Sequence, residues 1–295
     1  MKQSKPKKYL GELLPFGPIA SRRPEPRTKP IKEPIWTKNK AVLIQRYLLY
    51  FEYITKHGTY IDGFAGPQQP ESPEMWAAKL VLDNRPRWFR NFYLFDEDAA
   101  QIVRLRGLKL SQPPREKKEP KRIICIKHGD CNSLIADLLN SAKIREKEAT
   151  FCLLDQRTFE CHWSTLVRLS KYKQQGNKIE LFYFFPHGWL GRALAAQMDK
   201  EVIAKWWGKK DWPLLKDMRP PERLLAMIER FKKELGYWSV IPWPIYESER
   251  AGRIMYYMIH ASDHPEGPRL MSRAYSKALG PMESPSEIQI ELALS

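Results

Sequence analysis

Acidic residues end four of the first five short apolar runs of this chain, and their chemistry suits a nucleoside-like ligand. They are Asp62 in "TYID", Asp96 with Glu97 in "NFYLFDED", Asp130 in "RIICIKHGD" and Asp155 in "FCLLD". A carboxylate accepts hydrogen bonds from ammonium, hydroxyl and amino groups. Acids placed in this way predict a ligand that carries such donors and lies where the apolar runs end.

Two glycines follow the first acid directly, in the stretch "GTYIDGFAGPQQP" (58–70). Gly63 and Gly66 lack a Cβ atom, which allows the backbone to approach a ligand closely. A dinucleotide site would require G-x-G-x-x-G directly after the strand. Here no third glycine falls in register and an acid occupies the turn. The turn therefore disfavours NAD and is compatible with S-adenosylmethionine.

Each of the first acids has a role if S-adenosylmethionine is the cofactor. We expect Asp62 to hold the ammonium group of the ligand, directly or through water. Asp96 or Glu97 would accept both ribose hydroxyls, as acids do in dinucleotide folds. Asp130 would accept from the amino group of adenine.

Asp155 would face the reacting methyl group, and His187 in "FFPHGW" is a second candidate catalytic residue at the same edge. No cysteine follows a proline, which disfavours the cysteine route to cytosine C5 methylation. Methylation of a base nitrogen stays open, with Asp155 as hydrogen-bond acceptor. A ribose 2′-O route needs a cluster of lysine and acid, to which Lys40 and Asp155 could contribute. His260 and His264 lack the helix and third ligand of a metal site, so we expect no metal.

The elements that must position these residues alternate between apolar runs and helical segments. The runs at 59–62, 91–98, 122–130, 151–155 and 178–185 predict strands, with helical patterns between several of them. Such alternation predicts an α/β fold with a mostly parallel sheet and helices on both faces. Ligands of these sheets bind outside the carboxyl ends of the strands. The last two apolar runs predict a C-terminal antiparallel hairpin.

Changes of composition divide the chain into three parts. Residues 1–35 form a basic, proline-rich N-terminal tail, with nine Lys or Arg against three Glu. Residues 36–280 form the predicted α/β domain, which includes a helical, basic insertion at about 200–236. Residues 281–295 form a C-terminal tail.

The net charge of +16 concerns partners rather than fold. Nucleic acid is the commonest acidic partner of such a chain, and a basic surface without a specific partner is the alternative. No apolar run is long enough for a membrane helix, and the N-terminus lacks the apolar region of a signal peptide. We expect a cytoplasmic protein with four reduced, structural cysteines and no membrane partner.

Four blocks of this chain resemble the three-Cys-motif partner protein family (TcmP). They are "YIDGFAGP" (60–67), "FYLFDED" (92–98), "LLDQRTFECHW" (153–163) and "RIMYYMIHASDHPEG" (253–267), in the expected order. The resemblance covers roughly residues 36 to 272. It implies a Rossmann-like class I methyltransferase fold, S-adenosylmethionine as cofactor and a bacterial or phage origin. It also implies a companion protein with three cysteines that is similar to radical S-adenosylmethionine proteins.

The chain departs from the family pattern at two places. The first block of the family typically ends Gly-Pro-Gly, whereas Gln68 takes the last position here. The family block after the fourth strand often reads Asp-Pro-aromatic-Gly, whereas Asp155 is followed here by Gln156, Arg157 and Thr158. Two functions therefore stay open. One is a methyltransferase that acts on nucleic acid or together with the companion protein, and the other is a catalytically weakened scaffold that binds that companion.

Overall fold

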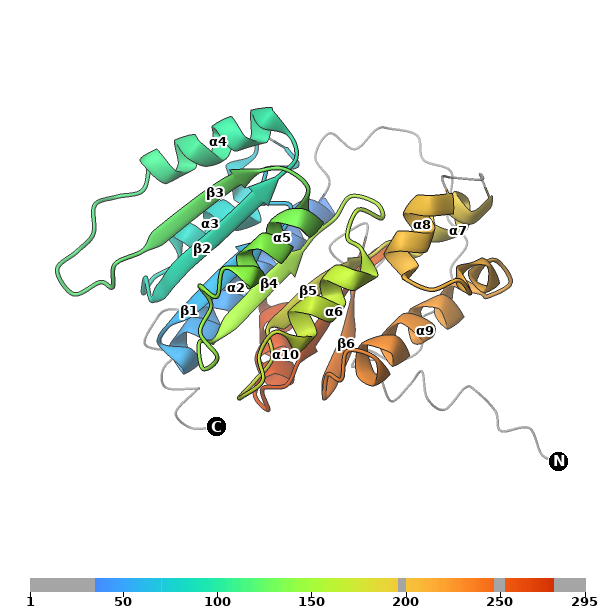
Figure 1. Cartoon of the computed structure of the whole chain (residues 1–295). Coiled ribbons are helices and arrows are strands. Elements are labelled where there is room, and N and C mark those ends of the chain that lie inside the picture. Colours follow the sequence, from blue (N-terminus) through green and yellow to red (C-terminus); the bar gives the residue numbers. More distant parts are fainter. Residues whose placement is uncertain (1–34, 70, 196–199, 247–252, 279–295) are drawn as a thin grey trace.

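The computed structural model describes residues 35–69, 71–195, 200–246 and 253–278, which build one sheet covered by helices (Figure 1). Both predicted tails lie outside these ranges, apart from Ile35.

The sheet has seven strands in the order β3-β2-β1-β4-β5-β7-β6. The pairs among the first five strands are parallel, and β7 runs antiparallel to both of its neighbours. This order with a reversed β7 is that of class I methyltransferases, and it confirms the predicted fold class. The strands are β1 (Gly58–Asp62), β2 (Phe89–Asp96), β3 (Ile123–His128), β4 (Thr150–Leu154), β5 (Glu180–Phe185), β6 (Ser239–Tyr246) and β7 (Ile254–Ser262).

Helices cover both faces of the sheet because successive strand residues point to opposite sides. Tyr60 packs in one apolar cluster and its neighbour Ile61 in the other. The Tyr60 cluster includes residues of α2 (Ile35–Thr55), α3 (Ala77–Asp83), α4 (Ala99–Leu110) and α10 (Gly267–Lys277). The Ile61 cluster includes residues of α5 (Cys131–Asn140), α6 (Trp163–Lys171), α7 (His187–Ala195), α8 (Lys200–Trp207) and α9 (Pro220–Lys233).

The central strands are buried on both faces, which explains why they read as continuous apolar runs. All residues of β1, β4 and β5 are buried, whereas the edge strand β3 has no buried residue. Two short 3-10 helices, η1 (Pro73–Met75) and η2 (Trp212–Lys216), complete the described elements.

A buried polar cluster ties α2, β5 and β7 together at the start of β5. Glu180 accepts hydrogen bonds from Tyr47 and from Ser262 Oγ at 2.7 Å, and its Oε1 lies 2.8 Å from His260 Nε2. Burial raises the pKa of Glu180, but His260 and the hydrogen bonds outweigh it and hold the pKa below its ordinary value. His260 lies within β7 and is part of this buried cluster.

The helices between β5 and β6, where the sequence predicts a basic insertion, contribute residues to the hydrophobic core. Trp206 and Trp207 of α8 are buried, and the guanidinium of Arg230 in α9 lies 4.3 Å from the centre of the Trp207 ring. None of the described helices combines the length and the apolar character that crossing a membrane requires.

Candidate functional site

The carboxyl edge of the parallel strands brings the predicted site residues together. Asp62 and Asp96 are the last residues of β1 and β2, and Asp155 directly follows β4. Asp130 precedes α5, and His187 is the first residue of α7 after β5. Because these strands are parallel and adjacent, their ends meet at one edge, where open α/β sheets bind ligands.

Asp62 is almost completely buried, with 1% of its surface exposed. The hydroxyl of Tyr60 donates to Oδ2 at 2.7 Å, and the backbone N–H of Phe64 donates to Oδ1 at 3.1 Å. Burial raises the pKa of Asp62 to about 7, although these two hydrogen bonds lower it. The carboxyl group therefore titrates near neutral pH, and a cation placed beside it would favour its ionised form.

The two glycines of the turn allow close packing of the chain on itself. A Cβ on Gly66 would lie 2.5 Å from Gln101 Cβ and 2.6 Å from Asp96 Oδ2. A Cβ on Gly63 would lie 3.1 Å from a methyl carbon of Leu154. Residue 66 therefore has no room for a side chain even before a ligand is considered. The expected approach of a ligand to these glycines stays a prediction.

Asp96 is oriented by two backbone amides. Its Oδ2 accepts from Gly66 N–H at 2.9 Å, and its Oδ1 accepts from Asp98 N–H at 2.9 Å. Each carboxylate oxygen has a second lone pair, so both can still accept a hydroxyl. The side chain of Glu97 is exposed. Either acid thus fits the predicted ribose contact, and Asp96 is the better positioned of the two.

Asp130 serves first as the N-cap of α5. Its carboxylate accepts from Ser133 N–H, from Ser133 Oγ and from Asn132 Nδ2, each at 2.9 Å. Burial raises the pKa of Asp130, but these hydrogen bonds outweigh it, so the group is ionised at neutral pH. Asn132 Oδ1 also accepts from the backbone N–H of His162 at 2.8 Å. The Asp130 carboxylate would therefore make the predicted contact with adenine in addition to these capping hydrogen bonds.

Asp155 forms a buried ion pair with a residue far away in the sequence. Its Oδ2 lies 2.5 Å from Lys40 Nζ of α2, and the two side chains are 10% and 5% exposed. Gln68 Nε2 donates to the same oxygen at 3.3 Å. The other carboxylate oxygen of Asp155, Oδ1, is buried and has no hydrogen-bond partner in the described part of the chain. The Tyr256 ring lies 5.6 Å from Lys40 Nζ. The structure therefore joins the lysine and the acid considered for the ribose route. It adds Gln68, which the sequence marked only as a departure from the family pattern, and Tyr256, which the sequence did not single out.

The unusual loop after Asp155 is held by Gln156. This buried side chain donates from Nε2 to the carbonyl of Phe184 at 3.1 Å and accepts from Cys161 N–H at 2.8 Å. It anchors the loop at the position where the family pattern has proline. Arg157 is exposed, and Phe159 is buried with its ring 5.1 Å from that of Trp206. Phe159 is therefore a core residue and does not stack on a substrate base.

His187 lies at the same edge, at the start of α7. Its Nδ1 is buried and has no hydrogen-bond partner among the described residues. Burial, together with Arg223 and Arg253, lowers the pKa of His187 to about 4. The imidazole is therefore neutral at neutral pH, and no described hydrogen bond links it to the Lys40–Asp155 pair.

The geometry around Asp155 suits a hydrogen-bond acceptor that is shielded from water. Asp155 Oδ1 is a buried acceptor with no hydrogen-bond partner among the described residues, while Lys40 and Gln68 hold the other oxygen. Such a group can accept a hydrogen bond from an amino or hydroxyl group of a substrate and orient that group for reaction.

Comparison with known proteins leaves the family open. No family model matches the chain, and no curated protein matches it. Trm1 from Pyrococcus horikoshii, solved with S-adenosyl-L-methionine, is similar over 80% of this chain and 58% of its own, with 14% identity and a TM-score of 0.43. A DUF574 family protein from Streptomyces avermitilis is similar over 77% of this chain and 83% of its own, with 13% identity and a TM-score of 0.45. The chain thus matches little more than half the length of Trm1.

Proposed function

We propose that this protein is an S-adenosylmethionine-dependent methyltransferase that acts on nucleic acid. The observation that carries the proposal is the buried Lys40–Asp155 ion pair at the carboxyl edge of the sheet, in which Asp155 Oδ1 has no hydrogen-bond partner within the described ranges. The sheet order of class I methyltransferases and the net charge of +16 support it.

The residues present fit the cofactor. Asp62 would hold its ammonium group, Asp96 or Glu97 its ribose hydroxyls and Asp130 its adenine amino group. Asp96 keeps a free lone pair on each oxygen, and a cation beside the buried carboxyl group of Asp62 would favour its ionised form. The cofactor supplies an activated methyl group when it is bound.

The chain itself would orient the substrate. Asp155 Oδ1 would accept a hydrogen bond from the nucleophilic amino or hydroxyl group. Lys40 would keep the carboxylate in place through its contact with Oδ2. His187, neutral at neutral pH, would act as a second acceptor through Nδ1.

A second candidate function rests on Gln68. This residue departs from the family pattern, and it occupies a hydrogen-bonding position on Asp155 that a substrate could use. The protein would then be a catalytically weakened methyltransferase fold that binds a three-Cys-motif companion, as the resemblance to TcmP implies. Under either function we propose a cytoplasmic protein of bacterial or phage origin, with residues 36–280 as the methyltransferase-like domain.

A methyl-transfer screen separates the two functions. Radiolabelled S-adenosylmethionine is incubated with the full chain and with DNA, RNA or the companion protein. The enzyme proposal expects label in a nucleic acid, and it expects Asp155→Asn to abolish the transfer. Cofactor binding without label in any substrate would favour the scaffold, and a folded protein that binds no cofactor would contradict the enzyme proposal.

Binding of the cofactor should depend on pH through Asp62. Its pKa is about 7 without ligand, so at lower pH the group must lose a proton before it can pair with an ammonium group. We expect affinity to rise roughly tenfold per unit from about pH 5 to 7 and to level off above, with a proton released on binding. Calorimetry in buffers of different ionisation enthalpy measures both effects. Asp62→Asn should remove the pH dependence, and an equal dependence in this variant would refute the role of Asp62.

A further inference from the structure

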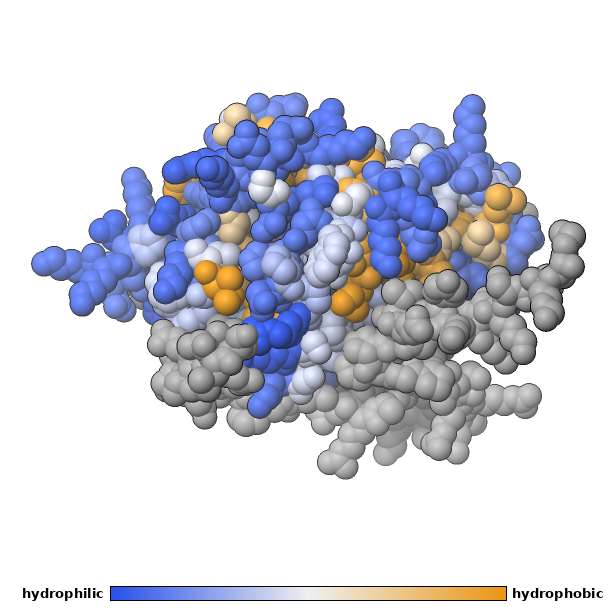
Figure 2. Space-filling model, turned by 90° about the horizontal axis from the view of Figure 1, so that it is seen from below, coloured by the Kyte–Doolittle hydropathy of each residue, from blue (hydrophilic) through white to orange (hydrophobic). Residues whose placement is uncertain are grey.

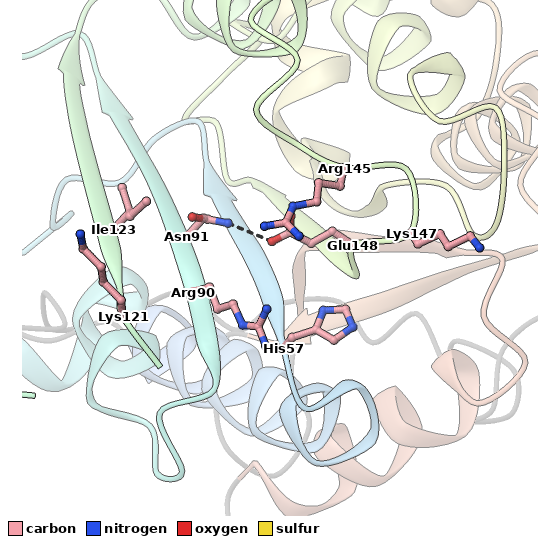
Figure 3. A pocket seen from close by; sticks show the side chains of 8 residues that line it. All are labelled: His57, Arg90, Asn91, Lys121, Ile123, Arg145, Lys147 and Glu148. Carbon is pink, nitrogen blue, oxygen red and sulfur yellow. Dashed lines mark hydrogen bonds between the residues drawn. The ribbon is translucent and has the colours of Figure 1, made fainter. Parts of the chain in front are cut away.

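A second site candidate lies at the opposite edge of the sheet, where the strands begin. A hollow of about 340 Å³ is lined there by His57, Arg90, Asn91, Lys121, Ile123, Arg145, Lys147 and Glu148 (Figure 3). These residues lie at or shortly before the starts of β1, β2, β3 and β4. The hollow is therefore separated from the acids of the carboxyl edge by the length of the strands.

The lining is strongly basic. Four Lys or Arg side chains face one carboxylate, and none of the four has an ion-pair partner among the described residues. Glu148 is engaged as an anchor, because its Oε1 accepts from Thr59 Oγ1 at 2.6 Å and from Asn91 Nδ2 at 2.9 Å. Burial and the nearby Arg90 lower the pKa of His57, so this ring adds no charge at neutral pH.

The cations are spread along the edge and not gathered at one point. Figure 3 shows the guanidinium groups of Arg90 and Arg145 on either side of the Asn91–Glu148 hydrogen bond, with Lys121 and Lys147 toward opposite ends of the view. They come from the starts of β3, β2 and β4, and β1 lies between β2 and β4 in the sheet. Three strand spacings of about 4.8 Å give a row about 14 Å long. A ligand with several phosphates in succession matches this row better than a single phosphate ion does.

We propose that this hollow binds the phosphate backbone of a nucleic-acid strand. Arginine guanidinium groups bind phosphate oxygens in pairs, and lysines add point charges at the flanks. Among the described lining residues, His57 is the only one with a ring, and Phe, Tyr and Trp are absent, so we expect contacts to phosphates, which carry no sequence information, and little stacking of bases. In the space-filling view of Figure 2, the described residues are mostly hydrophilic, with a few apolar patches among them. The inference rests on the proposed function only for the class of ligand.

The test compares two double variants that remove the same charge. Arg90→Gln/Arg145→Gln removes the central pair, and Arg106→Gln/Lys109→Gln removes two exposed cations from α4. Fluorescence anisotropy with a labelled single-stranded RNA of mixed sequence measures affinity at several salt concentrations. We expect the first variant to bind at least about tenfold more weakly. Its salt slope should be flatter by about 1.4, which corresponds to two lost contacts on a single strand. The α4 variant should stay within about twofold of the wild type.

Equal losses in the two variants would overturn the proposal, because the effect would then come from overall charge. ATP is titrated in a parallel arm. A third outcome is that ATP binds, RNA does not bind and the Arg90/Arg145 variant no longer binds ATP. The hollow would then be a site for free nucleotides, and the proposal of a nucleic-acid strand would be overturned. Thermal unfolding confirms that each variant is folded, and cofactor affinity is measured on the same samples. RNA binding that depends on Arg90 and Arg145 in a protein without methyl transfer would refute the proposed function and support this inference.

Discussion

Lys40→Met is expected to destabilise the protein by about 3–5 kcal/mol, because it leaves a buried carboxylate without its counter-charge. Lys40 Nζ lies 2.5 Å from Asp155 Oδ2, and water reaches little of either side chain. Chemical denaturation measures the change in the free energy of unfolding. If the pair also serves the reaction, methyl transfer should be lost at temperatures where the variant is still folded.

The chain contains a matched control. Lys79 and Asp83 form an ion pair with the same 2.5 Å separation, but their side chains are 33% and 39% exposed. Lys79→Met should cost no more than about 1 kcal/mol, because water screens exposed pairs. The double variant Lys40→Met/Asp155→Asn removes the uncompensated charge, so it should recover stability but not activity. Equal costs for Lys40→Met and Lys79→Met would show that burial of the pair is unimportant.

Gly66→Ala is expected to abolish cofactor binding and to lower stability by about 1–3 kcal/mol through overpacking. The added Cβ would lie 2.5 Å from Gln101 Cβ and 2.6 Å from Asp96 Oδ2. It would therefore displace the acid that we propose for the ribose and strain the hydrogen bond from Gly66 N–H. Calorimetric titration with S-adenosylmethionine and denaturation of the same sample measure the two effects.

Gly107→Ala provides the control for the same chemical change. This glycine lies within α4, and a Cβ on it would meet nothing within 4 Å. Alanine should stabilise the helix there by about 0.5–1 kcal/mol and leave binding unchanged. If Gly66→Ala binds the cofactor as the wild type does, the cofactor site is not at the β1 turn.

The sequence alone determined the sheet and the edge at which its acids gather. Continuous apolar runs mark strands that helices bury on both faces, and this pattern is local in the chain. Asp62, Asp96 and Asp155 each lie at or directly after the end of such a run. Their meeting at one edge follows from parallel pairing, so no tertiary detail was needed to predict it.

Only the tertiary structure decided what each acid contacts. Lys40 and Asp155 are far apart in sequence, and nothing local indicates that α2 delivers its lysine to the end of β4. The same holds for the basic hollow, whose residues come from four separate segments and meet only because β3, β2, β1 and β4 are neighbours. Local residue patterns record the faces of strands and helices, whereas contacts between distant side chains depend on how those elements pack.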